Sequence, residues 1–193
     1  MSYGKKSNMA TSSDDVTVTN CYNSKMLLRC LSNIATGNHT QTGAVLRAVP
    51  ALLSILQGSH NALLSSLDPH VLGGISLEED SCWTIGNIAG DSDEYRSALL
   101  EQNVLQPIIK FLQQSLTLWT AACQISESQF SHSVSAAQHL GRAGTAVWTL
   151  SNIARGATPG NVFINSGELT CLVALHDVTV LDLAYLKYVA AFD

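Results

Sequence analysis

CWTIGNIAGD, at residues 82–91, predicts the architecture of this chain because it is written twice more with small changes. LRCLSNIATG occupies residues 28–37 and VWTLSNIARG occupies residues 147–156. Each copy of this repeat motif joins an apolar stretch with helical spacing to Asn-Ile-Ala and a Gly-containing turn. A motif that recurs in this way indicates a repeat protein, whose units bury their apolar faces against their neighbours.

Two copies of the repeat motif place a Trp four residues before the Asn. The pairs are Trp83 with Asn87 and Trp148 with Asn152, while the first copy supplies Asn33. Residues four apart lie on one face of a helix, so each pair projects in one direction. An aromatic ring and an amide repeated on stacked helices predict a surface that holds an extended peptide.

Composition narrows the class of protein. Hydrophobic residues make up 46% of the chain and charged residues 13%, which favours an ordered protein. The net charge of −5 argues against a nucleic-acid partner and suits a basic one. Residues 1–20 are polar, lack the apolar core of a secretory signal and are expected to be a disordered lead-in. With no membrane-length apolar stretch, we expect a soluble intracellular protein without a membrane partner.

The sequence contains no motif for catalysis or metal binding. Five cysteines are odd in number and scattered, and Cys30, Cys82 and Cys171 lie in apolar helical patterns that predict small core residues. No His or Cys spacing suits a metal, and no nucleophile elbow, P-loop or HExxH string is present. We therefore predict a protein that is not an enzyme, with no catalytic residue, metal or cofactor.

The three motif asparagines are 54 and 65 residues apart, at positions 33, 87 and 152. Helical repeats of the armadillo and HEAT type recur every roughly 40–47 residues. The excess length lies in two inserts rich in Ser, Gly, Gln and His, near 57–76 and 124–142. Such inserts form loops between helices or lengthen a neighbouring helix.

Between the motifs, each unit continues with a short helix and a longer one. The stretches that carry them are 41–56, 94–112 and 160–175. Pro50 and Pro107 lie near the start of the longer helix, where the missing N–H has no cost. Three glycines follow the motif and are expected to form helix C-terminal caps: Gly37, Gly90 and Gly156. The chain is therefore predicted to be an all-α solenoid.

The motif strings resemble a known family. CWTIGNIAGDSDEYR, at 82–96, resembles the third armadillo repeat of importin-α, the adaptor that reads nuclear localisation signals. AVWTLSNIARG, at 146–156, is similar to the fourth repeat, and LRCLSNIATGNHTQT, at 28–42, to the second. The resemblance covers roughly residues 25–175. It extends to a divergent importin-α-like group, the transmembrane and coiled-coil domain-containing armadillo proteins.

The resemblance implies an armadillo-repeat right-handed superhelical solenoid of about three repeats with long inserts. The armadillo domain would cover residues 21–193, after the lead-in. The three repeats are expected at roughly 21–76, 77–141 and 142–193.

In importin-α, paired Trp and Asn residues line the cargo groove. By resemblance, Asn33, Asn87 and Asn152 would hydrogen-bond the backbone of an extended peptide, since an amide offers both a donor and an acceptor. Trp83 and Trp148 would form the walls of slots for Lys or Arg side chains and attract their cationic heads.

The family's deepest lysine site uses a Gly carbonyl, a Thr hydroxyl and an Asp carboxylate. The matching positions here are Gly37, Thr42 and Asp91, which keep the family's residue types. Helix C-terminal ends carry partial negative charge, which favours a lysine there. One position departs from the family: Arg29 stands where a Trp is expected, which removes one slot and adds a positive charge.

The implied function is an adaptor that binds Lys/Arg-rich nuclear localisation signals for protein import into the nucleus. Its location would be the cytoplasm and the nucleus. A second implied partner is a carrier of the importin-β type, although the Arg/Lys-rich segment that docks on it is not visible, since Lys5 and Lys6 alone stand near the start.

Two other functions stay open at this point. One is a protein-interaction scaffold of the β-catenin type, whose groove is typically basic. The other is a truncated repeat fragment with little binding. For individual residues, the tryptophans could serve inter-repeat packing, the asparagines helix-end hydrogen bonds, and Asp91 the cap of the following helix.

Overall fold

A computed structural model of the chain describes residues 13–58, 76–124 and 130–155, and the statements below concern these residues. Their regular elements are helices, with no strand among them, which confirms the all-α prediction for the described residues. The elements are α1 (Ser13–Ala35), α2 (His39–Val45), the 3-10 turn η1 (Leu46–Ala48), α3 (Val49–Leu56), α6 (Leu77–Asp91), α7 (Asp93–Glu101), α8 (Leu105–Gln124) and α9 (Phe130–Ala154).

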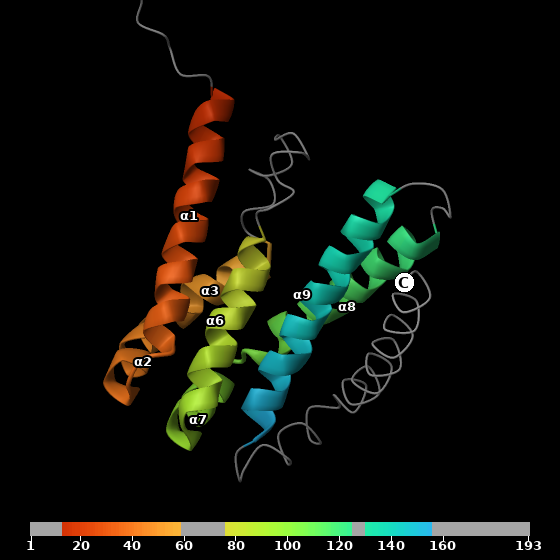
Figure 1. The fold of residues 1–193 in the computed structure, drawn as a ribbon. Coiled ribbons are helices and arrows are strands. Elements are labelled where there is room, and N and C mark those ends of the chain that lie inside the picture. The colour runs from red at the N-terminus through yellow and green to blue at the C-terminus, as the bar shows by residue number, and fades with distance from the viewer. Residues whose placement is uncertain (1–12, 59–75, 125–129, 156–193) are drawn as a thin grey trace, which may run out of the picture.

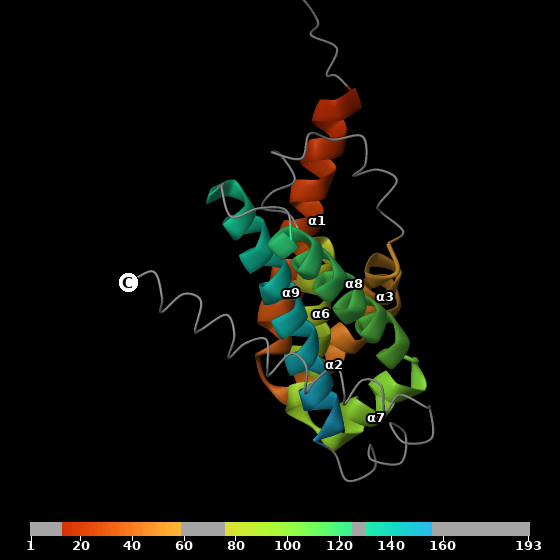
Figure 2. The same ribbon diagram turned by 90° about the vertical axis from the view of Figure 1, so that its right-hand side faces the viewer.

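The helices that carry the repeat motif, α1, α6 and α9, stand side by side in one row (Figure 1). Helices α3 and α8 pack against α6 and α9 respectively and form a second row, which Figure 2 shows from the side. The short helices α2 and α7 lie at one end of the two rows. The predicted order of short helix, longer helix and motif helix is confirmed for the described units.

The core lies between the two rows. Apolar side chains at helical spacing, such as Ile85, Ile88 and Ala89 on α6, turn one face of each helix inward. The largest fully buried apolar side chains are Leu52, Ile85, Ile88, Leu99, Ile108, Phe111, Leu112, Leu150 and Ile153. Each such side chain contributes about 1.5–3 kcal/mol of transfer free energy, which explains why the stacked helices form one continuous core.

Polar side chains determine where the helices begin. Asn38 and Gln41 form a reciprocal capping box at the start of α2, and Ser76 accepts the backbone N–H of Glu79 at the start of α6. Ser92 does the same for α7 by accepting from the N–H of Tyr95 at 3.3 Å.

Ser92 also corrects two predictions about the α6–α7 junction. Its extended backbone (φ −152°, ψ 162°) ends α6 after Asp91. Gly90 is therefore inside the helix and is not its cap, and the alternative in which Asp91 caps α7 is wrong because Ser92 holds that position. Gly37 does follow α1, in a turn, whereas Gly156 lies outside the described residues.

The expected disordered lead-in at 1–20 is too long. Helix α1 begins at Ser13, and Cys21 and Leu28 on it are buried. The polar composition favoured disorder, but Ser and Asp are also typical of helix starts, and packing of the later turns stabilises the whole helix. Residues 1–12 lie outside the described residues.

The second insert lengthens helices more than it forms a loop. Helix α8 continues to Gln124 and α9 begins at Phe130, so most of the predicted insert at 124–142 is helical. Most of the first insert, at 59–75, and the last part of the third repeat, at 156–193, lie outside the described residues.

The cysteine prediction is confirmed at one position and wrong at another. Cys82 is fully buried, and burial raises the pKa of its thiol to about 12. Cys30 is exposed on α1, because the apolar stretch around it continues over two faces of that helix. Cys171 lies outside the described residues.

Candidate functional site

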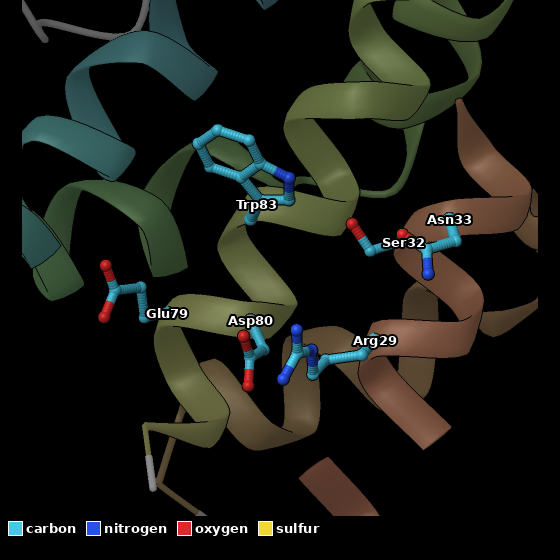
Figure 3. Close-up of a pocket in the computed structure, with 6 residues that line it drawn as sticks. All are labelled: Arg29, Ser32, Asn33, Glu79, Asp80 and Trp83. Carbon is cyan, nitrogen blue, oxygen red and sulfur yellow. The ribbon is translucent and has the colours of Figure 1, made fainter. Parts of the chain in front are cut away.

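A pocket opens between the first two motif helices. Arg29, Ser32 and Asn33 line it from α1, and Glu79, Asp80 and Trp83 line it from α6 (Figure 3). These six residues are called the α1–α6 pocket below. They combine an indole ring, an amide and two carboxylates, which is the chemistry that holds a lysine or arginine side chain.

The pocket's carboxylates are partly removed from water. Desolvation by burial raises the pKa of both Glu79 and Asp80 above the ordinary range. The charges of Lys25 and Arg29 act in the opposite direction at Asp80. Arg29 extends from α1 toward Asp80, as Figure 3 shows. The guanidinium of Arg29 is therefore a positive charge of the protein itself that lies in the pocket.

Replacing Glu79 with Gln should weaken the pH dependence of stability. A carboxyl whose pKa is raised on folding binds protons more readily in the folded state, so the contribution of Glu79 to the unfolding free energy falls as pH rises above about 4.5. In the wild type the Thr145 hydroxyl donates to Glu79 at 3.2 Å. A Gln side chain keeps an acceptor for this hydroxyl, but Gln does not ionise.

Urea unfolding at several pH values between 4.5 and 7 measures the slope of the unfolding free energy against pH. Glu101→Gln, an exposed change on α7, serves as the charge-matched control. Other groups remain in the variant: the Asp80 carboxyl adds a slope of the same sign, and His139, whose pKa is lowered by burial, adds one of the opposite sign. The difference in slope between the variant and the wild type therefore measures Glu79. An unchanged slope would contradict the assignment to Glu79.

The two motif tryptophans lie together. Trp83 is 46% exposed, and its ring stacks on that of Trp148 with the centroids 4.6 Å apart and the planes at 21°. An aliphatic chain between two rings needs about 7–8 Å, because it contacts each ring at 3.5–4.0 Å. The slot implied between these tryptophans is thus closed in this structure, while Trp83 also lines the α1–α6 pocket.

The motif asparagines differ in their surroundings. Asn33 is exposed and lines the pocket. Asn87 is half-buried and donates from Nδ2 to the Ser32 hydroxyl at 2.9 Å. Asn152 is 3% exposed and donates to the Gly86 carbonyl at 3.1 Å. Two of the three amides therefore bond the preceding motif helix, and Asn33 remains on the open surface.

The residues of the implied lysine site also contact other residues of the chain. Thr42 is fully buried, and its hydroxyl proton is directed at the carbonyls of Ala35 (3.1 Å) and Asn38 (3.2 Å). Gly37 leaves room for the Gln41 side chain of the capping box, since a Cβ there would lie 2.2 Å from Gln41 Oε1. The Asp91 carboxylate is 2.6 Å from Nδ1 of His39.

Sequence reasoning missed part of this site. Glu79 precedes Trp83 by four residues, so helical spacing could have placed the two on one face of α6. Ser32 carried no such signal, because it meets Asn87 across 55 positions of sequence. His39 was missed for the same reason, since 52 positions separate it from Asp91.

The units stack on one another, and each consists of a short helix, a longer helix and a motif helix. With tryptophan and asparagine on the row of motif helices, this is the architecture of an armadillo-type helical repeat protein. None of the described helices combines the length and apolar character needed to cross a membrane.

Two curated relatives carry the importin-α name. The chain is 33% identical over 99 residues to importin subunit alpha-9 of Arabidopsis thaliana, which covers 50% of this chain and 17% of the relative. It is 27% identical over 153 residues to probable importin subunit alpha-A of Dictyostelium discoideum, covering 77% and 23% respectively. No protein-family model matches the chain, and no solved structure gives a significant match.

These relatives confirm the resemblance to the importin-α armadillo family, at modest identity and over part of the chain. With the all-helical fold, they identify the architecture as an armadillo solenoid. The chain spans less than a quarter of the length of either relative.

Proposed function

We propose that this protein is an importin-α-like adaptor, which binds extended Lys/Arg-rich nuclear localisation signals for import into the nucleus. The observation that carries the proposal is the α1–α6 pocket, whose lining includes Trp83, Asn33 and the acidic residues Glu79 and Asp80. The adaptor would act in the cytoplasm and the nucleus, and an importin-β-type carrier would be its second partner.

Each component of the pocket contributes a different interaction. The exposed Trp83 ring attracts a cationic head with about 0.5–1 kcal/mol. A hydrogen bond from a lysine or arginine to the carboxylate of Asp80 contributes about 1.5–3 kcal/mol. The Asn33 amide can pair with a peptide group of any sequence, which suits a ligand defined by its charge.

The other expected site residues lie outside this pocket and have different surroundings. Trp148 holds Trp83 from behind by stacking, and Asn87 can reach a peptide if it releases Ser32. Thr42 and Asn152 are buried hydrogen-bond donors that shape the row of motif helices. Gly37 and Asp91 lie beside the start of α2, where His39 is the present partner of Asp91.

Titration of a fluorescent Lys-Lys-Lys-Arg-Lys peptide tests the proposal. We expect salt-dependent binding by the wild type, because the attraction between exposed charges is screened. Trp83→Ala should weaken binding about two- to fivefold, and Asp80→Asn about tenfold. Glu101→Gln removes the same charge from an exposed position outside the pocket and should leave the affinity within about twofold.

Replacement of Arg29 should change the peptide affinity in the opposite direction. Its guanidinium repels a basic ligand at the pocket mouth, so Arg29→Ala should tighten binding about two- to fivefold. Binding of acidic peptides alone would favour the β-catenin-type scaffold. No binding of either peptide at micromolar protein would favour the repeat fragment with little binding.

A further inference from the structure

A short polar contact between the first two repeats joins His39 to Asp91. Nδ1 of His39, the first residue of α2, lies 2.6 Å from Oδ2 of Asp91, the last residue of α6. The Asp91 side chain is only 19% exposed, whereas the His39 side chain is 56% exposed. The imidazole therefore lies between Asp91 and solvent, where a ligand's cation would have to approach.

Other contacts hold the imidazole in that position. Its ring stacks on the Tyr95 ring with centroids 4.5 Å apart and planes at 10°. The Tyr95 hydroxyl donates to the His39 carbonyl at 2.7 Å, so α7 holds both the ring and the backbone. Nε2 of His39 is 3.9 Å from a carboxylate oxygen of Glu94. The ring is thus built into the junction of α2, α6 and α7.

We propose that His39 is an intramolecular ligand of Asp91, which competes with the basic side chain of a bound peptide. This inference rests on the proposed function. Nδ1 of His39 occupies the position at Asp91 Oδ2 that a lysine or arginine side chain would need for its own hydrogen bond. Removal of the imidazole should therefore strengthen peptide binding.

The charged groups around the imidazole come from α6 and α7. Helix α6 contributes Asp91, and α7 contributes Asp93, Glu94, Tyr95 and Arg96 in its first turn. Asp93 and Arg96 pair with each other at 2.6 Å, and the same guanidinium donates to the Ala89 carbonyl. The last turn of α1 and the rest of α2 add no charged side chain. His39 therefore faces two carboxylates, those of Asp91 and Glu94.

Peptide titration of the wild type and of His39→Ser tests the competition. His39→Ser should bind about two- to fivefold more tightly than the wild type. Thr40→Ala, at the adjacent exposed position, should keep the wild-type affinity. The inference is overturned if His39→Ser binds no more tightly than the wild type.

A second measurement separates this inference from the proposed function. Thermal unfolding of His39→Ser, Asp91→Asn and the double variant, without peptide, should give midpoint losses that do not add, because both single changes break one contact. If no variant binds the peptide, the proposed function fails and the competition with it, and a coupled cycle then identifies the pair as purely structural. Additive losses would overturn the His39–Asp91 contact itself.

Discussion

Phe111→Ala should lower the free energy of unfolding by about 3–5 kcal/mol, as expected for truncation of a fully buried aromatic side chain. Phe111 lies on α8, the longer helix of the second unit, which packs against α9. The Arg142 guanidinium lies over its ring, 5.0 Å from the centroid. The truncation therefore removes both core packing and the surface on which Arg142 rests.

Urea unfolding followed by circular dichroism measures this loss. Leu118→Ala, on the same helix seven positions later, is the matched control, because Leu118 is exposed and its truncation should change stability by less than about 0.5 kcal/mol. Similar losses in the two variants would contradict the assignment of Phe111 to the core.

Gly86→Ala should cost about 1–3 kcal/mol, although alanine is the better helix former. A Cβ at this position would lie 2.3 Å from the Trp148 ring and 2.7 Å from the Thr149 hydroxyl. Neither neighbour moves freely: Trp148 stacks on Trp83, and the buried Thr149 donates to the Cys82 carbonyl at 3.1 Å. The added methyl group must therefore push α6 and α9 apart.

Gly90→Ala, one helical turn later on α6, is a close control. A Cβ there would meet only Asn152 Nδ2, at an ordinary 3.7 Å, so the variant should gain up to about 1 kcal/mol from helix propensity. Chemical unfolding of both variants should give opposite signs. If Gly86→Ala were as stable as Gly90→Ala, the close approach of α6 and α9 at Trp148 would be wrong.

The Gly86 variant also connects packing to function. Displacement of Trp148 would disturb the stack that supports Trp83 in the α1–α6 pocket. A stability effect and a binding effect would then arise from one added methyl group, whereas Trp83→Ala would remove the ring from the pocket directly.

Much of the fold was predictable because its signals are local. The repeat motif predicted a helix within each of its copies, at 28–37, 82–91 and 147–156, and the spacing of apolar residues along each helix determines its buried face. The prediction failed at Gly90 and at the lead-in, where the helix boundary depends on one cap, Ser92, and on packing of the later turns of α1.

The candidate site was predictable only in part. The position of Trp83 and Asn33 on neighbouring motif helices follows from the repeat itself, and the structure places both in one pocket. The closed Trp83–Trp148 stack depends on the distance between α6 and α9, which no local pattern contains.

Local periodicity thus accounts for the helices, their order and the row on which the tryptophans and asparagines lie, because a helix repeats every 3.6 residues whatever it packs against. The partner of each polar group depends on how helices distant in sequence meet. Asn152 bonds the Gly86 carbonyl across 66 positions, and His39 bonds Asp91 across 52. Such pairs depend on the separation and register of packed helices. Tertiary structure alone therefore showed which polar groups on the motif helices remain exposed, such as Asn33, and which are bonded within the chain, such as Asn152.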